Sequence, residues 1–243
     1  MGRLLIGWAE ESIVPEKKVS LAGQFFERIS EYVESEITVT AMAVEADDNE
    51  KMILISADVI YCQDWLVDMV RGKFAEYNTG VDAQKLVIAA THTHTSHFMQ
   101  PSPNLAKPGL NAATILEEFL PAGKKYTKLV TSGDDVMTPS EAGEFVAERI
   151  ALAAKRAWEN REEALFTNEF GRVSVGMCRR VCYDDGSAQM WGDTNTANFV
   201  ALEGGNDSGM ELLYTFDKNR KLTGVVANIA CPAQILEQRS FIS

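Results

Sequence analysis

The sequence predicts an α/β fold with mixed sheets and flanking helices, arranged as a layered α/β sandwich. Two observations support this prediction. In the first half of the chain, two strand-like segments are followed by a helical pattern and a further apolar strand. In the second half, a long amphipathic helical pattern is followed by several short β-rich segments. Helices and strands are therefore expected to pack together in layers.

The first half is expected to begin with a strand over residues 4–9 and to continue with a hairpin. Residues 37–46 alternate between two faces, residues 47–50 form a polar turn, and residues 52–58 form a continuous apolar run. A continuous apolar run predicts a strand that is buried on both faces. Asp64 is expected to cap a helix over residues 65–77, because its apolar side chains recur at helical spacing. The next strand is expected over residues 85–91.

The second half begins with a capping box, Thr138-Pro139-Ser140-Glu141, which opens a helix that ends near Trp158. Four strands are then expected, over residues 171–181, 188–191, 210–216 and 222–229. The polar residues 217–221 make a hairpin of the last two strands. Since the chain contains no repeat, linker or low-complexity tract, residues 1–243 are expected to form a single domain.

Composition excludes several classes of partner. The 243 residues are 46% hydrophobic, which is enough for a sizeable core, and the net charge of −12 argues against nucleic acid or an anionic membrane surface. No apolar run approaches the roughly 18 residues that span a bilayer, and the N-terminus does not resemble a signal peptide. The four cysteines lack the spacing of a disulfide framework. A cytoplasmic location is therefore expected, and the oligomeric state is left open.

The histidines are concentrated at the end of one predicted strand. His92, His94 and His97 are all the histidines of the chain, and they follow the apolar run over residues 87–90. Residues at i and i+2 of a strand share a face, so His92 and His94 are expected to point into one space. Two imidazoles supply half of a tetrahedral zinc site. A hydrogen-bonded structural role is the alternative, but α/β proteins tend to place their sites at strand ends, which favours metal binding or catalysis.

Four further residues are candidates because they also lie at predicted strand ends or within strands. Cys231 follows an apolar strand and precedes a proline, and it is either an inert buried thiol or a ligand brought beside the histidines by a neighbouring strand. Arg179 and Arg180 are adjacent, so one can enter a site to bind an oxyanion while the other is solvated. Asp58 ends the second strand of the hairpin and can orient a histidine from behind.

Several motifs together resemble the neutral/alkaline (non-lysosomal) ceramidases. Residues 91–94, Thr-His-Thr-His, resemble the THTHSGP signature of that family. Residues 6–15 resemble its opening G-x-A-x-x-D-I-T-P, and residues 53–58 resemble its VSADL strand. Residues 177–180 are similar to its N-R-S/R segment, and residues 230–232 are similar to A-x-H-P. Ser96 and His97 depart from the usual Gly-Pro, and the later GDVSPN motif is absent.

The resemblance implies a zinc-dependent hydrolase of an amide bond, in which metal-activated water attacks the carbonyl of a small or lipid-like N-acyl substrate. It implies that His92 is a metal ligand, that His94 lies near the substrate carbonyl, and that Arg179 assists the transition state. The second metal histidine of the family falls on Cys231, and a thiolate is itself a good zinc ligand. The family's catalytic domain is longer, so the chain is expected to be its N-terminal portion. The alternative is a catalytically inactive binding module, or an incomplete fragment, of the same fold.

Overall fold

The computed structural model describes residues 3–24, 26–47, 50–102, 134–236 and 238–243. Within it the chain divides into two compact units, the first comprising Met1–Ala164 with Ala233–Ser243 and the second comprising Leu165–Pro232. A compact unit is not by itself an independently folding domain. The single domain expected over residues 1–243 therefore stays a prediction.

The first unit is built on a mixed sheet in which the strands follow the order β8-β1-β4-β5-β6. Their bounds are β1 (Leu5–Ser12), β4 (Thr38–Glu45), β5 (Lys51–Ala57), β6 (Leu86–Ala90) and β8 (Glu162–Arg172), the last of which continues into the second unit. β4 pairs antiparallel with β1 and with β5, whereas β5 and β6 run parallel. The predicted hairpin and the predicted α/β class with mixed sheets are both confirmed.

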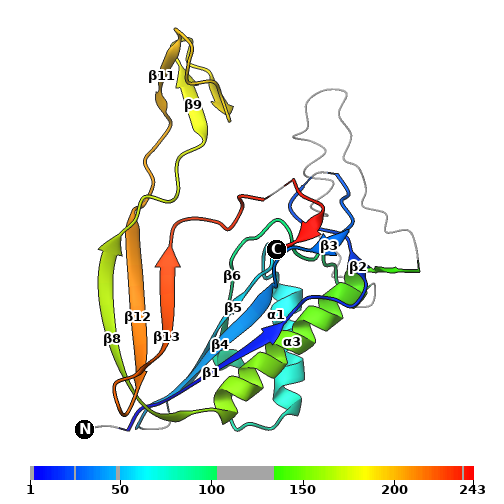
Figure 1. Ribbon diagram of the computed structural model, residues 1–243, viewed down its shortest axis with the longest axis vertical. Coiled ribbons are helices and arrows are strands. Elements are labelled where there is room, and N and C mark those ends of the chain that lie inside the picture. Colours follow the sequence, from blue (N-terminus) through cyan, green and yellow to red (C-terminus); the bar gives the residue numbers. More distant parts are fainter. Residues whose placement is uncertain (1–2, 25, 48–49, 103–133, 237) are drawn as a thin grey trace. The chain divides into compact units, whose positions relative to one another are not determined.

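Two helices pack against each other and against this sheet (Figure 1). They are α1 (Asp64–Glu76) and α3 (Pro139–Glu159). The capping box of α3 is present as predicted, with Thr138 and Glu141 exchanging hydrogen bonds. The predicted cap of α1 is wrong, because Gln63 occupies that position without a side-chain bond. Asp64 is instead the first helical residue, where its charge favourably meets the positive end of the helix dipole.

Helix α3 fits closely against its neighbours because its buried face is formed largely of small residues. The buried residues of α3 are Ala142, Gly143, Val146, Ala147, Ile150, Ala151, Ala153, Ala154, Ala157 and Trp158. Helix α1 contributes Leu66, Val70 and Phe74 to the same core. Small side chains allow two backbones to approach closely, so the larger side chains of α1 and of the strands fill the remaining space.

Short elements complete the first unit. They are β2 (Lys18–Val19), β3 (Tyr32–Val33), the 3-10 helix η2 (Ala83–Lys85), β7 (Val136–Met137) and β14 (Phe241–Ile242). β2 pairs with β7, and β3 pairs with β14, both in parallel. The second of these pairs holds the segment 238–243 against residues 31–35. Sequence analysis missed these two-residue pairs, because they are too short to show a periodicity.

The second unit consists of long strands and a small sheet. β12 (Gly209–Asp217) and β13 (Leu222–Ile229) form the predicted hairpin, and β12 also lies beside β8. The small sheet has the order β10 (Ala188–Met190), β9 (Arg180–Tyr183) and β11 (Phe199–Leu202). The predicted strand over residues 171–181 is wrong, because β8 ends at Arg172 and β9 begins only at Arg180. β11 was not predicted.

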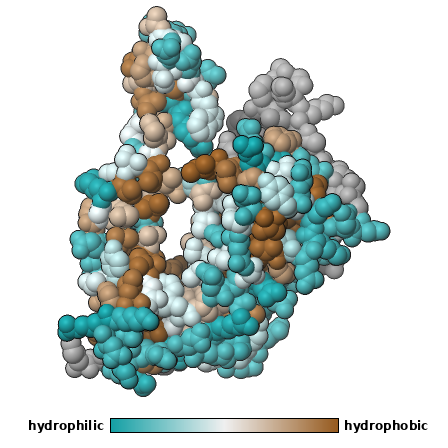
Figure 2. Space-filling view, viewed as in Figure 1, coloured by the Kyte–Doolittle hydropathy of each residue, from teal (hydrophilic) through white to brown (hydrophobic). Residues whose placement is uncertain are grey.

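Apolar side chains reach the surface of the second unit on both its long strands and its small sheet (Figure 2). The exposed residues include Phe166, Phe170, Met177, Met190, Trp191, Val200, Leu222 and Val225. Among the described residues, no helix is both long enough and apolar enough to cross a membrane.

Candidate functional site

The histidine-bearing segment begins where strand β6 ends. β6 stops at Ala90, so the expectation that His92 and His94 share one face of a strand is wrong. The backbone N–H groups of Thr91 and His92 donate to the carbonyls of Ala57 and Val59, at 3.0 and 3.1 Å. His92 has a φ of 63°, in the left-handed region that residues other than glycine rarely adopt. The chain therefore leaves the sheet in a turn that is fixed to the end of β5.

The two imidazoles nevertheless face each other. The Nε2 atoms of His92 and His94 are 3.3 Å apart, and the rings meet edge to face with centroids 5.0 Å apart. Nδ1 of His92 lies 2.7 Å from the carbonyl oxygen of Ile60. A carbonyl oxygen only accepts, so Nδ1 of His92 donates, and a neutral ring then carries its lone pair on Nε2. His92 is exposed and His94 is buried, so the pair lies at the edge of the core.

The two Nε2 atoms are close enough for both rings to reach one zinc ion, whether or not both bind it. Two ligand atoms, each about 2.0–2.1 Å from a tetrahedral zinc, lie roughly 3.3–3.4 Å apart. The observed Nε2–Nε2 distance of 3.3 Å meets that requirement. The bond from His92 Nδ1 to a backbone carbonyl is the usual outer contact of a metal-binding histidine. Among the residues that the structure describes, no group of three or more His, Cys, Asp or Glu side chains is gathered for a metal.

His97 lies apart from this pair in a closed environment. Its residue is 0% exposed, and its Nδ1 lies 3.2 Å from Ser96 Oγ. Its Nε2 has no hydrogen-bond partner within the described part of the chain. Burial alone lowers the pKa of His97 from its ordinary 6.5 to about 4. His97 is therefore neutral at pH 7.

Asp58 reaches the histidine segment through Thr91. Its Oδ1 accepts from Thr91 Oγ1 at 3.0 Å, and its Oδ2 accepts from the backbone N–H of Thr38 at 2.9 Å. The carboxylate thus fixes the residue that precedes His92. A direct role in orienting a histidine stays a prediction.

The threonines of the same segment line a small cavity of about 260 Å³. Its walls are formed by Asp58, Thr91, Thr93, Thr95, Ala233, Ile235, Leu236 and Ser243. Thr93 and Thr95 both donate through Oγ1 to the carbonyl oxygen of Ser243, at 3.0 and 2.6 Å. The two threonines therefore hold Ser243 against the histidine turn.

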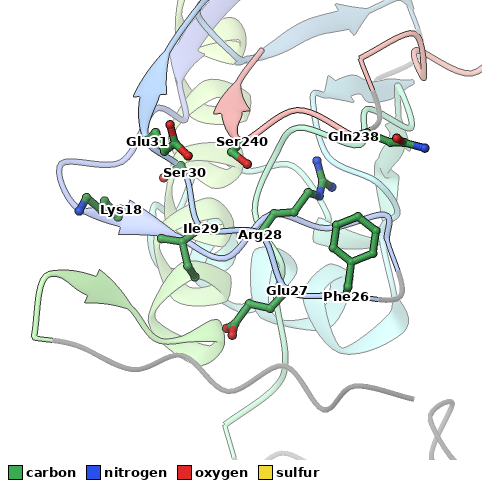
Figure 3. Close-up of a pocket in the computed structure, with 9 residues that line it drawn as sticks. All are labelled: Lys18, Phe26, Glu27, Arg28, Ile29, Ser30, Glu31, Gln238 and Ser240. Carbon is green, nitrogen blue, oxygen red and sulfur yellow. The ribbon is translucent and has the colours of Figure 1, made fainter. Parts of the chain in front are cut away.

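A larger cavity of about 510 Å³ lies between Lys18 and residues 26–31 on one side and Gln238 and Ser240 on the other (Figure 3). Its walls are formed by Lys18, Phe26, Glu27, Arg28, Ile29, Ser30, Glu31, Gln238 and Ser240. Arg28 is the residue that connects this cavity to the candidate site, because its guanidinium also donates to the carbonyl oxygen of His94 at 2.7 Å. Sequence analysis missed Arg28, since no local pattern shows that it lies near residue 94.

Arg179 and Cys231 belong to the second unit. Arg179 is exposed, and its guanidinium carbon lies 4.9 Å from the centre of the Trp191 ring. Arg180 instead forms an ion pair with Glu203, with Nε and Oε1 2.8 Å apart. Cys231 is a half-buried free thiol that follows β13, and its Sγ donates to the carbonyl oxygen of Pro232 at 3.7 Å. Joint use of these residues with His92 and His94 stays a prediction.

Solved structures of ceramidases share this architecture. The neutral ceramidase from Pseudomonas aeruginosa matches 99% of the chain with a TM-score of 0.66 and 15% sequence identity. The chain shares the ceramidase fold. A ceramidase complexed with C2 matches 99% of the chain with a TM-score of 0.65 and 14% identity. The fold implied by the sequence motifs is thereby confirmed.

The chain spans about a third of the length of these ceramidases, 34% of one and 33% of the other. No protein-family model matches the sequence, and no curated protein matches it at a significant level.

Proposed function

We propose that this chain is part of a zinc-dependent hydrolase that cleaves the amide bond of an N-acyl, lipid-like substrate. The observation that carries the proposal is the pair of imidazoles on a ceramidase fold, with Nε2 atoms 3.3 Å apart. A histidine pair alone is compatible with many sites, and a fold alone hosts many reactions. The two together favour amide hydrolysis, since the pair occupies the Thr-His-Thr-His segment that resembles the family signature.

In this proposal His92 and Cys231 hold the zinc ion. His92 is suited to that role because its Nδ1 is engaged by the Ile60 carbonyl, which leaves Nε2 able to donate its lone pair. Cys231 is assigned as the second ligand because it is only two residues from a contact with the histidine segment. The backbone N–H of Ala233 donates to the carbonyl of Thr91 at 2.9 Å, so the chain returns to the neighbour of His92 two residues after Cys231. Two residues span at most about 7 Å.

His94 and Arg179 act on the substrate in this proposal, as donors to the oxygen that becomes negative when the carbonyl is attacked. One well-placed donor of this kind contributes about 3 kcal/mol to transition-state stabilisation. A bound zinc ion supplies Lewis-acid polarisation and lowers the pKa of a water molecule. Asp58 keeps the preceding residue, Thr91, in place through the bond to its hydroxyl.

The test is stoichiometric metal analysis combined with hydrolysis of an N-acyl amide such as a short-chain ceramide. We expect the chain to take up zinc and the His92→Ala variant to lose it. His97→Gln is the matched control, because it removes the one imidazole that lies apart from the pair. Full zinc occupancy in His92→Ala would refute the ligand role. A chain that binds no zinc and hydrolyses no amide would instead support the alternative, an inactive binding module or an incomplete fragment of the same fold.

A further inference from the structure

The ring of His94 rests directly on the backbone of Gly23. A Cβ added at Gly23 would lie 2.8 Å from the Cβ of His94 and closer still to its Cγ and Nδ1. Gly23 also has a φ of +99°, which L side chains rarely adopt. Space and conformation thus both require glycine here. The imidazole of His94 is held between this backbone on one side and the ring of His92 on another.

Arg28 connects the Gly23 segment to His94 itself. One terminal nitrogen, Nη2, donates both of its hydrogens, to the carbonyl of Ala22 at 2.5 Å and to the carbonyl of His94 at 2.7 Å. The other, Nη1, donates to the carbonyl of Arg239 at 2.6 Å. Arg28 is only 4% exposed, and its side chain extends toward the segment that carries Gln238 and Ser240 (Figure 3). One planar guanidinium therefore joins three separate segments of the chain.

A buried arginine bonded to carbonyls could serve stability alone. Two features favour a role in the site. Nη2 binds the carbonyl of His94, not that of some other residue of the turn, and its second bond holds Ala22, the residue before Gly23. The N–H of Ala22 also donates to the Ser96 carbonyl at 2.9 Å, so the segment is held against the chain both at His94 and two residues beyond it.

We propose that Arg28 and Gly23 are positioning residues for His94. Arg28 fixes the backbone of His94 relative to Ala22, and Gly23 provides the surface on which the imidazole lies. Together they direct Nε2 of His94 toward Nε2 of His92 before any ligand binds, which is the preorganisation that a catalytic pair requires. The functional meaning of this arrangement rests on the proposed hydrolase, whereas the arrangement itself can be tested without it.

The first test records the imidazole NMR signals of the metal-free chain, whose three histidines give few resonances to assign. Gly23→Ala is compared with Gly80→Ala, a matched control with a φ of +77° and no atom within 4 Å of an added Cβ. We expect Gly23→Ala to shift the ring signals of His94 and His92 while those of His97 stay in place. We expect Gly80→Ala to leave all three rings unchanged. Unchanged His94 signals in folded Gly23→Ala would overturn the proposal.

Arg28→Lys is the second variant, because it keeps the charge but loses the planar fork, and it decides the question if Gly23→Ala does not fold. We expect it to shift the His94 signals, with Arg180→Lys as a surface control. His94 signals that match the unsubstituted chain would contradict the role of Arg28.

Zinc titration of the same samples separates this proposal from the proposed function. In the proposed function His92 holds the zinc ion, whereas His94 acts on the substrate. We therefore expect Gly23→Ala and Arg28→Lys to take up zinc as the unsubstituted chain and Gly80→Ala do, and to impair amide hydrolysis instead. If the unsubstituted chain binds no zinc, the proposed function fails, and the metal-free spectra still decide whether Gly23 and Arg28 position His94.

Discussion

The histidines show how strongly the immediate surroundings decide what a residue can do. His92 is exposed and donates through Nδ1 to a backbone carbonyl. His97, five positions later, is 0% exposed and has an unpaired Nε2 within the described residues. Taking a proton at His97 would place a charge where there is no water to solvate it. One histidine can therefore bind a ligand, whereas the other is kept neutral by the core.

This difference predicts that His97 makes the stability of the chain depend on pH. Burial lowers the pKa of folded His97 to about 4, against 6.5 ordinarily. Between these values the unfolded chain binds a proton that the folded chain does not, so the free energy of unfolding falls as pH falls. One pKa unit corresponds to about 1.4 kcal/mol, which gives a loss of roughly 3 kcal/mol between pH 7 and pH 4.

Denaturant unfolding of the unsubstituted chain and of His97→Gln at pH 7, 5.5 and 4 measures this contribution. Other groups titrate in the same range, so the informative quantity is the difference between the two proteins. We expect the acid-dependent loss of stability to be smaller in His97→Gln. An identical pH dependence in both would show that His97 does not titrate as its burial implies.

At the level of elements, the sequence predicts helices and strands correctly wherever a local pattern of apolar and polar residues is long enough. The capping box and the apolar stripe predict the ends of α3 to within a residue or two, and the polar turns between apolar segments predict the two hairpins. Failures occur where tertiary contacts decide. Strand β6 ends at Ala90, although the sequence that follows it is also rich in β-branched residues. It ends there because the backbone N–H groups of Thr91 and His92 are bonded to Ala57 and Val59. Likewise Arg28 and Gly23 are recognisable only through contacts with a residue some 70 positions away.

Two glycines, one packed against the end of α3 and one on the open face of α1, are expected to respond differently to substitution by alanine. A Cβ at Gly7 in β1 would lie 2.6 Å from the backbone nitrogen of Arg161 and closer still to the carbonyl of Ala157, so backbone would have to move. At Gly72, in α1, an added Cβ meets nothing within 4 Å. Overpacking of this kind costs about 1–3 kcal/mol, whereas glycine in an open helix position costs roughly 1 kcal/mol relative to alanine.

We therefore expect opposite effects from the same substitution. Gly7→Ala should lower the free energy of unfolding by about 1–3 kcal/mol, and Gly72→Ala should raise it by up to roughly 1 kcal/mol. Thermal or urea unfolding, followed by circular dichroism, measures both. A Gly7→Ala variant as stable as the parent would mean that β1 and the end of α3 are not in such close contact.

At the scale of the whole molecule, the candidate residues are divided between the two compact units. His92, His94 and Asp58 belong to the first, and Arg179 and Cys231 belong to the second. Residue types and strand-end positions identified both sets, but no local pattern could indicate that they would fall in different units. The segment that connects the units after Cys231 returns at Ala233 to the carbonyl of Thr91.

The cysteines allow the proposed role of Cys231 as a zinc ligand to be tested, because Cys182 is a matched control for Cys231. Both are half-buried free thiols of the second unit, but Cys182 lies within β9 of the small sheet. Losing an outer contact already weakens metal binding by about 10–100-fold, so losing a ligand should cost at least as much. We expect Cys231→Ser to weaken zinc binding to that extent in a chelator competition and Cys182→Ser to leave it unchanged. Equal affinity in both variants would show that His92 binds zinc without Cys231.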